Sequence, residues 1–349
     1  MNKLIRQSEL IAVALVIVLL LVVFPLTLDP FRLNLMGKYM SFAFVAIGVV
    51  LTWGYGGILS LGQGIFFGMG GYMMAMFLKL EASAPELPDF MVWSSVEKLP
   101  LWWEPFNSLL FTLLLILLVP ALLAYLFSFL IFKKRVGGVY FSIVTLSLAL
   151  AMTVLIVGQQ GDTGGANGIT DFRTLLGLDI IGDQAKLVMY LVQSVAVSLA
   201  MLLALAVVRS RFGKILIAIR DREDRVRFSG YNTAHIKAFV FTLSAILSSI
   251  GGAFYSAQVG LIAPSVVGVA ASVEMVIYAA VGGRLSIPGA VVGALFIGFL
   301  KSYLSETFPE GWLFALGALF ILVVMIMPNG LAGLVTRVLS RRSVVRGAP

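Results

Sequence analysis

The sequence predicts an all-α polytopic membrane protein with about ten transmembrane helices. Hydrophobic residues make up 60% of the 349-residue chain and charged residues only 12%. So few charges could not cover the surface of a soluble protein of this length. The apolar residues also gather in runs of about 20, which is the length of helix that crosses roughly 30 Å of hydrocarbon.

Ten apolar runs fit membrane spans when the chain is followed in order. They lie at approximately 10–28, 36–53, 58–79, 108–132, 137–157, 186–208, 238–259, 270–282, 286–304 and 312–328. The eighth run is shorter than a full span, so we expect it to be tilted, broken or only half-spanning. No low-complexity linker divides the chain, which favours a single transmembrane domain over residues 1–349.

Charged, proline-rich or glycine-rich segments separate these runs. Basic residues precede the first span, the cluster 133–135 precedes the fifth, and the charged segment 209–237 precedes the seventh. A proline- and tryptophan-rich insert at 80–107 precedes the fourth span, and a glycine-rich loop at 161–170 follows the fifth. Such residues end helices and form turns, so each segment is predicted to be a connection.

The distribution of lysine and arginine predicts that both termini are cytoplasmic. In that orientation 18 of the 25 basic residues face the cytoplasm: two near the N-terminus, three at 133–135, eight at 209–237, Arg284, and four in the tail 329–349. Of the 17 acidic residues, 13 fall outside or near the outer face. Because the lysine and arginine bias sets membrane orientation, the opposite topology is disfavoured.

The cytoplasmic segment 209–237 is the most charged part of the chain. It carries eight basic and three acidic residues between two apolar runs. A structured, charged loop at this place is where a soluble partner can push on the membrane domain. The segment therefore favours energised transport over passive permeation.

The composition excludes several other classes of function. There is no cysteine and a single histidine, His235, so no Cys- or His-cluster metal site is predicted. The tract 59–63 (LSLGQ) superficially resembles an ATP-binding cassette signature, but the chain has no phosphate-binding loop and no catalytic signature. The basic residues follow topology, so nucleic acid is not an expected partner.

The insert 80–107 is predicted to lie outside the membrane. Four prolines oppose a long helix there, and Trp93, Trp102 and Trp103 suit the membrane interface. The aromatic side chains either rest on the lipid headgroups or form a docking surface for an external partner.

Glycines within the spans predict close helix packing and a candidate pathway. Gly64 and Gly68, like Gly289 and Gly293, have the small-xxx-small spacing that lets helix backbones approach. Glycine-rich interruptions of a span also offer backbone groups to a polar solute. Gln63 is the polar side chain that we expect nearest to such a pathway.

Two more polar features have two interpretations each. The loop 161–170 (GDTGGANGIT) is either a simple connection or the lining of an outer mouth. Glu274 lies in an apolar stretch near the outer end of the eighth span. Such a carboxylate either faces a cavity or is paired or reaches the membrane surface.

Five segments, in this order, give the chain a family resemblance over residues 36–335. They are 57–63 (GILSLGQ), 135–146 (RVGGVYFSIVTL), 163–169 (TGGANGI), the cytoplasmic segment, and 327–331 (MPNGL). The chain resembles the permease subunits of branched-chain amino acid-type ABC importers. Within that family it is most similar to the second permease of urea importers, partly through the Trp-rich insert and Ile217, where many relatives have glutamate.

The resemblance implies a multi-pass permease of the bacterial inner membrane without cofactors. The implied partners are a homologous second permease, two cytosolic ATP-binding subunits, a periplasmic solute-binding protein and the lipid bilayer. The cytoplasmic segment would be the coupling helix, with the coupling residues Gly213, Ala218, Arg220, Asp221 and Gly230. The candidate pathway residues are Gln63, Thr145, Asn167 and Glu274.

The solute implied by the resemblance is urea, moved by alternating access. Branched-chain amino acids and short-chain amides are the alternatives within the same class. A passive solute channel and an intramembrane enzyme are the alternatives from other classes. A channel would not need Arg220 or Asp221, and an enzyme would depend on His235.

Overall fold

The computed structural model describes residues 3–172, 174–180, 182–326 and 330–333. Eight helical segments within these residues are long and apolar enough to cross a membrane: Glu9–Thr27, Pro30–Tyr55, Gln63–Ser83, Leu109–Lys133, Val139–Gly158, Asp183–Arg209, Thr233–Val259 and Ile287–Thr307. Two shorter apolar helices, α12 (Val269–Gly282) and α14 (Trp312–Ile326), match the eighth and tenth predicted spans. The prediction of an all-α protein with about ten membrane helices is confirmed.

The first two spans are each built from consecutive helical pieces. The first joins α1 (Lys3–Val18), a π-helix (η1, Leu19–Val23) and α2 (Phe24–Thr27). The second joins α3 (Pro30–Val49) to a π-helix (η2, Val50–Tyr55). The remaining long spans are α4 (Gln63–Ser83), α6 (Leu109–Lys133), α7 (Val139–Gly158), α9 (Asp183–Arg209), α11 (Thr233–Val259) and α13 (Ile287–Thr307).

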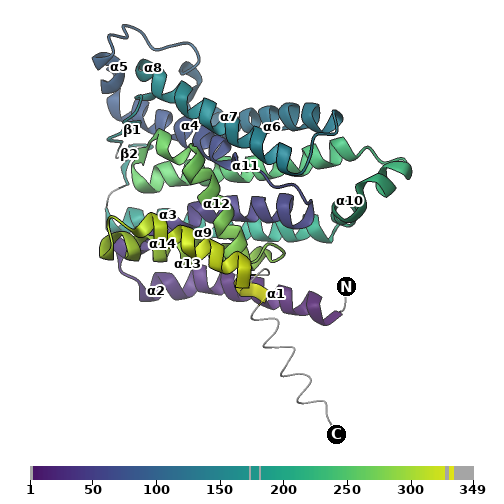
Figure 1. The fold of residues 1–349 in the computed structure, drawn as a ribbon. Coiled ribbons are helices and arrows are strands. Elements are labelled where there is room, and N and C mark those ends of the chain that lie inside the picture. The colour runs from purple at the N-terminus through teal and green to yellow at the C-terminus, as the bar shows by residue number, and fades with distance from the viewer. Residues whose placement is uncertain (1–2, 173, 181, 327–329, 334–349) are drawn as a thin grey trace.

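The non-spanning elements divide between two opposite faces of the bundle. The long helices lie side by side in Figure 1, with α10 (Arg211–Phe228) at one end and α5 (Asp89–Trp93) at the other. We call these ends the α10 face and the insert face. An ion pair of 3.6 Å between Glu9 and Arg209 places the start of the first span beside the end of α9, at the α10 face.

Short elements cover the insert face. They are α5, the 3₁₀ turn η3 (Glu104–Asn107), α8 (Gln160–Thr163), the antiparallel pair β1 (Ile169–Thr170) and β4 (Leu261–Ile262), the pair β2 (Thr174–Leu175) and β3 (Leu178–Asp179), and the turn η4 (Pro264–Val266). An ion pair of 2.8 Å between Lys79 and Asp89 holds the insert to the end of α4. The predicted absence of a long helix in the insert is confirmed.

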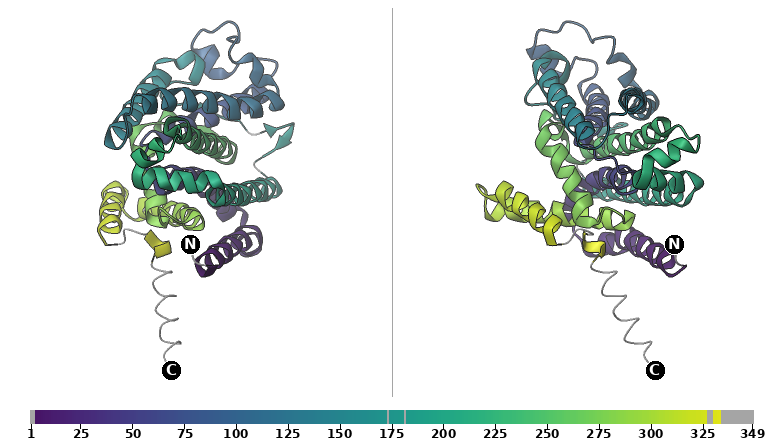
Figure 2. Two further views of the ribbon diagram at one scale, coloured as in Figure 1. Left: turned by 90° about the vertical axis from the view of Figure 1, so that its right-hand side faces the viewer. Right: turned by 45° about the vertical axis from the view of Figure 1, so that its right-hand side comes forward.

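Helix α11 forms the centre of the bundle and packs against α3, α4 and α6. The two views of Figure 2 show the layers on either side of it. Glycines permit this packing: a side chain at Gly251 would collide with the backbone of α3, and one at Gly252 with the backbone of α4. The predicted packing role of Gly289 and Gly293 is also confirmed, because both face α12 at backbone distance.

Two spans are interrupted. The predicted third span, 58–79, is corrected by the structure, because α4 begins only at Gln63 and residues 56–62 are not helical. Glycines at 56, 57 and 62 disfavour helix there, and Gly57 has a φ of +69°. The short eighth span follows a second stretch without α-helix, 260–268, which contains β4 and η4, and it measures about 21 Å at 1.5 Å per residue.

The basic tail predicted at 329–349 lies outside the described residues except for 330–333. The same holds for residues 327–329 of the 327–331 motif. The described residues contain no group of three or more histidine, cysteine, aspartate or glutamate side chains arranged to hold a metal ion.

Candidate functional site

Gln63, the first residue of α4, is fully buried inside the bundle. Its Oε1 atom accepts a 2.9 Å hydrogen bond from the hydroxyl of Ser248, which is near the middle of the 27-residue α11. Its Nε2 atom has no hydrogen-bond partner among the described residues. The structure thus places a primary amide with a free donor group at the point where the third span is broken.

Hydroxyl groups of α7 hold the non-helical stretch 56–62. Ser142 donates a 2.7 Å hydrogen bond to the carbonyl of Leu59. Thr145 accepts one of 3.1 Å from the amide of Leu61 and donates one of 2.9 Å to the carbonyl of Ser142. Non-helical backbone survives inside a membrane only where such partners satisfy its polar groups. The structure therefore brings the predicted pathway residue Thr145 into contact with the short segment that ends at Gln63.

The start of α12 meets the start of α4. The hydroxyl of Ser272 accepts a 3.1 Å hydrogen bond from the amide of Gly64, and Gly268 faces Thr153 of α7. From this junction α4 runs to the insert at the insert face. Helix α12, oblique in Figure 1, ends beside Gly54 at the α10 face. We call the meeting point of Gln63, Thr145, Ser248 and Ser272 the helix junction; two broken helices with converging starts are typical of solute sites in transporters.

Asn167 lies away from the helix junction, exposed in the loop at the insert face. That loop packs on the stretch 260–268, since Ile169 pairs with Ile262 and Gly168 contacts the carbonyl of Ile262. Gly168 has a φ of +75°, and a side chain there would collide with that carbonyl. The loop therefore covers the insert-face end of the segment that leads to α12.

Glu274 also points away from the helix junction. Lys301 of α13 donates 2.8 Å hydrogen bonds to both carboxylate oxygens, and Tyr278 donates a third. Glu274 is two residues from Ser272, so the two side chains emerge from nearly opposite sides of α12. The pairing compensates the charge of the carboxylate within an apolar helix. No sequence pattern indicated Lys301 as the partner, because it lies 27 positions away.

The five residues predicted to couple to a cytosolic partner lie on or just after α10. Gly213 is buried against α9, and its amide donates to the Ser210 hydroxyl, which caps the helix. Ala218 and Asp221 are exposed, and Gly230 follows the helix with a φ of +87°. The helix is broken at Arg222, whose φ of −153° and ψ of 80° are not helical.

Arg220 is exposed, but its side chain reaches the turn that ends the second span. Its Nη1 donates a 2.8 Å hydrogen bond to the carbonyl of Gly54, and its Nε donates one of 2.9 Å to Asp221. Its side-chain stem lies against Gly57, where a Cβ would approach the Arg220 Cγ to 2.8 Å. Arg220 is thus bound to the turn 54–57 and packed against it, and this turn leads directly into residues 58–62 and Gln63.

The turn 54–57 also contacts the connection between α12 and α13. The hydroxyl of Tyr55 donates a 2.8 Å hydrogen bond to the carbonyl of Leu285, and Gly54 packs on the backbone of Arg284. The segment that leads into α4 and the connection that follows α12 therefore meet at this turn, to which Arg220 of α10 is bound. The glycine-rich segments at 54–57 (GYGG) and 281–283 (VGG) share a loose sequence similarity.

Glu223 joins the second half of α10 to the membrane helices, and sequence reasoning missed this role. Its carboxylate accepts hydrogen bonds from Arg227 (2.9 Å), Thr233 (3.0 Å) and Lys237 (3.1 Å). Partial burial acts to raise the pKa of Glu223, but the attraction of Lys237 and these hydrogen bonds outweigh it and hold the pKa below its usual value. The ammonium of Lys237 also lies 4.6 Å from the ring centre of Phe132 in α6.

Comparison with known proteins gives a consistent set of relatives. The family model described as "Branched-chain amino acid transport system / permease component" matches residues 31–326. The high-affinity branched-chain amino acid transport system permease protein LivM of Escherichia coli is 24% identical over 347 residues, covering 93% of this chain and 75% of LivM. LivH of Salmonella typhimurium, with the same description, is 27% identical over 201 residues, or 55% of this chain and 64% of LivH.

Another relative carries a different solute in its name. The ribose import permease protein RbsC of Haemophilus influenzae is 25% identical over 198 residues, covering 54% of this chain and 59% of RbsC. No solved structure matches the chain.

Proposed function

This chain belongs to the family of branched-chain amino acid transport system permease components, and we propose from that premise that it moves a small neutral polar solute through an ATP-driven importer. Its partners would be a homologous second permease, two cytosolic ATP-binding subunits and a periplasmic solute-binding protein. Its place would be a bacterial inner membrane, with the α10 face in the cytoplasm.

The observation that carries this proposal is the continuity between α10 and Gln63. Arg220 binds the turn 54–57, the turn continues into residues 58–62, and these end at the helix junction. A displacement of α10 by a cytosolic subunit would move the turn as a rigid unit. The movement would then reach the only segment of the third span that is not helical in the described residues.

Alternating access would then proceed by exchange of hydrogen bonds along α7. Ser142 and Thr145 bind the stretch 56–62, and on this proposal these bonds would hold the helix junction closed toward the α10 face. Helix α7 lies at the periphery: 28% of its most apolar stretch is buried, compared with 78% in α4. A shift of the turn 54–57 would separate this stretch from α7 and open the path from Gln63 to the cytoplasm.

The chemistry of the helix junction suits an uncharged solute. Its side chains are an amide and three hydroxyls, from Gln63, Thr145, Ser248 and Ser272, and all are buried. The free Nε2 of Gln63 can donate to a carbonyl oxygen, while hydroxyls can accept from N–H groups. Urea has both kinds of group and is the solute that we propose, with short-chain amides and branched-chain amino acids as the alternatives.

On this proposal the two remaining candidate residues lie away from the helix junction and have different roles. Asn167 would belong to the outer mouth, at the loop that covers the stretch 260–268. Glu274 would stabilise α12 through Lys301 and would not contact solute. A passive channel is the alternative from another class; it would have no need for the bond between Arg220 and Gly54.

Uptake of labelled urea and labelled leucine, in cells with and without this gene, tests the proposal. Loss of urea uptake alone would support it. Loss of leucine uptake instead would keep the permease and replace the solute. No change in either would contradict the substrate class, and uptake that persists in energy-depleted cells would favour the channel.

A further inference from the structure

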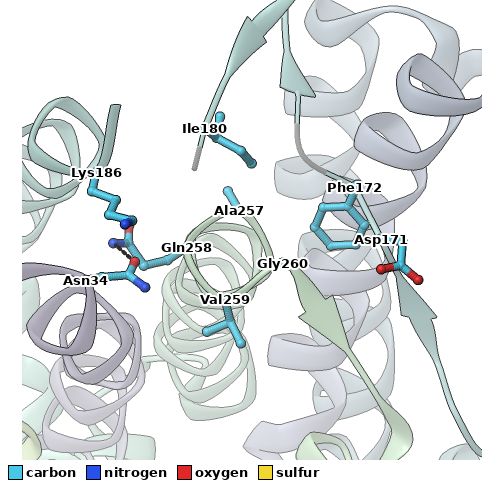
Figure 3. Close-up of a pocket in the computed structure, with 9 residues that line it drawn as sticks. All are labelled: Asn34, Asp171, Phe172, Ile180, Lys186, Ala257, Gln258, Val259 and Gly260. Atoms are coloured by element: carbon cyan, nitrogen blue, oxygen red, sulfur yellow. Dashed lines mark hydrogen bonds between the residues drawn. The ribbon is translucent and has the colours of Figure 1, made fainter. Parts of the chain in front are cut away.

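A second polar site lies at the insert face; its residue Gln258 is on the same helix as Ser248 of the helix junction, about 15 Å further along at 1.5 Å per residue. It is a hollow of about 240 Å³ between the first turns of α3 and α9, the end of α11, and the segment after β1 (Figure 3). A smaller hollow of about 110 Å³ shares Asn34 and Val259 with it, so the two adjoin. Neither is lined by Gln63, Thr145, Ser248 or Ser272.

Two carboxamide side chains form the polar wall of this hollow. Gln258 Nε2 donates a 2.7 Å hydrogen bond to Asn34 Oδ1, and Figure 3 shows the two groups pointing toward each other. Gln258 is only 9% exposed. This pair leaves Gln258 Oε1 as a hydrogen-bond acceptor and Asn34 Nδ2 as a donor, and neither has a partner among the described residues.

A glycine on α3, Gly37, leaves room for the Gln258 side chain. The side chain of Gln258 lies across Gly37 of α3, where a Cβ would approach the Gln258 Cδ to 2.6 Å. A second buried carboxamide, Gln193 of α9, holds the carbonyl of Gly37 with a 2.9 Å hydrogen bond. Any larger residue at Gly37 would push Gln258 out of its position, so the arrangement depends on a glycine at this place.

The charged side chains that line the larger hollow are Lys186 and Asp171. The ammonium of Lys186 is bound to Asp183 at 3.3 Å, and Asp171 lies beyond Phe172, on the side away from the carboxamides (Figure 3). The carboxamide pair therefore offers one free donor and one free acceptor, and the ammonium groups of Lys186 and, in the adjoining hollow, Lys38 lie near it. A planar molecule with a carbonyl and an N–H on neighbouring positions can bind both at once, as one amide binds another.

We propose that this hollow is a receiving site for a small neutral amide, with Asn34 donating to the solute carbonyl and Gln258 accepting from its N–H. The inference rests on the proposed function, because an importer with its α10 face in the cytoplasm takes up solute from the insert face. It adds a first binding step, before the solute reaches the helix junction. We call the hollow the amide site.

Direct occupancy can be measured because the chain has no cysteine. In the assembled importer, Val259→Cys would report on the amide site through its reaction with a membrane-impermeant maleimide. We expect millimolar urea or acetamide to slow this reaction, and to have no effect on Glu97→Cys in the exposed insert. Equal protection of both cysteines, protection by leucine alone, or no protection would overturn the proposal.

Transport kinetics give the second measurement. Gln258→Met keeps a side chain of similar length over Gly37 but removes the carbonyl and the NH2 of the amide. We expect it to raise the KM for urea about tenfold, with kcat changed less than about twofold. The matched control is Gln159→Met, at an exposed carboxamide that lines neither hollow; it should leave KM unchanged.

The two measurements separate the amide site from the proposed function. An unchanged KM in Gln258→Met would assign the carboxamide pair a purely structural role and overturn the inference. If the wild-type importer transported no urea, the proposed solute would fail. Protection of Val259→Cys by acetamide would still support the amide site in that case, since protection does not require transport.

Discussion

The guanidinium of Arg220 donates a 2.8 Å hydrogen bond to the carbonyl of Gly54, which joins the most charged helix of the chain to the end of a membrane span. The same carbonyl belongs to the turn that precedes the broken start of α4. A contact of this kind transmits a push because an arginine bound to a carbonyl and packed on Gly57 cannot move alone. Changes at Arg220 and at the helix junction should therefore affect the same transport step.

Replacement of Gln63 by leucine should abolish solute movement. The change removes the free Nε2 donor and the hydrogen bond to Ser248. Leucine is apolar but has a similar volume, so the packing is retained. Uptake into vesicles containing the assembled importer should fall more than about tenfold, while ATP hydrolysis continues. The control Ser248→Ala leaves the amide in place and should lower uptake less. Wild-type uptake by Gln63→Leu would exclude Gln63 from the pathway.

Thr145→Val should weaken the closed state, because the amide of Leu61 would lose its buried acceptor. An unsatisfied buried group of this kind costs about 1–3 kcal/mol. The variant is nearly the same shape, so a lower unfolding midpoint in detergent and reduced uptake would report the lost hydrogen bond. Thr145→Ser keeps the hydroxyl and should behave like the wild type. Identical behaviour of the two variants would show that the bond is dispensable.

The attachment of α10 should depend on pH through Glu223. Its pKa in the folded protein lies below the usual value, so the unfolded chain binds a proton more readily. The stabilisation is therefore present above the usual carboxyl pKa, about 4.3, and is lost as pH falls through the lower folded value. Protease sensitivity of α10 should rise in the wild type as the pH falls below the usual carboxyl pKa.

Glu223→Gln provides the matched comparison for this dependence. It keeps an acceptor for Arg227 and Thr233 but loses the charge that attracts Lys237. The variant should be more protease-sensitive than the wild type at neutral pH and change less on acidification. Parallel pH profiles for the two proteins would assign the titration to another group.

Gly168→Ala should disturb the cover of the outer segment. The residue has a φ of +75° and contacts the carbonyl of Ile262, so both its backbone conformation and its packing oppose a side chain. Gly177 has the same φ, but a Cβ at that position would meet no atom within 4 Å, which makes Gly177→Ala the control for backbone strain alone. Uptake and amide exchange protection at 260–268 should fall only in Gly168→Ala. Equal effects would show that the contact with Ile262 is unimportant.

Hydropathy was sufficient to predict most spans, because membrane helices are specified by length and apolar content alone. It failed at 58–62, which was predicted to begin the third span but is not helical, because Gly57 precedes it and Gly62 ends it, and both disfavour helix. The short eighth span was correctly predicted, since its apolar run is bounded by glycines on both sides.

The candidate site was less predictable than the fold. The polar residues Gln63 and Thr145 stood out in apolar runs, but their contact with residues 58–62 and with Ser248 depends on packing between distant helices. The ion pair of Glu274 with Lys301 and the contacts of Glu223 with Lys237 join residues 27 and 14 positions apart. No local pattern indicates such partners, because each helix could rotate to present another face.

The most direct test of the account is ATP-driven urea uptake by the reconstituted importer carrying Arg220→Glu. The carboxylate would repel the carbonyl of Gly54, so α10 should no longer move the turn 54–57. A charge reversal on the opposite face, Arg32→Glu, is the control, because Arg32 is 70% exposed and paired only with Asp29 among the described residues. We expect Arg220→Glu to remain in the membrane and lose uptake, with Arg32→Glu near wild type. Full uptake by Arg220→Glu would contradict the coupling of α10 to the helix junction.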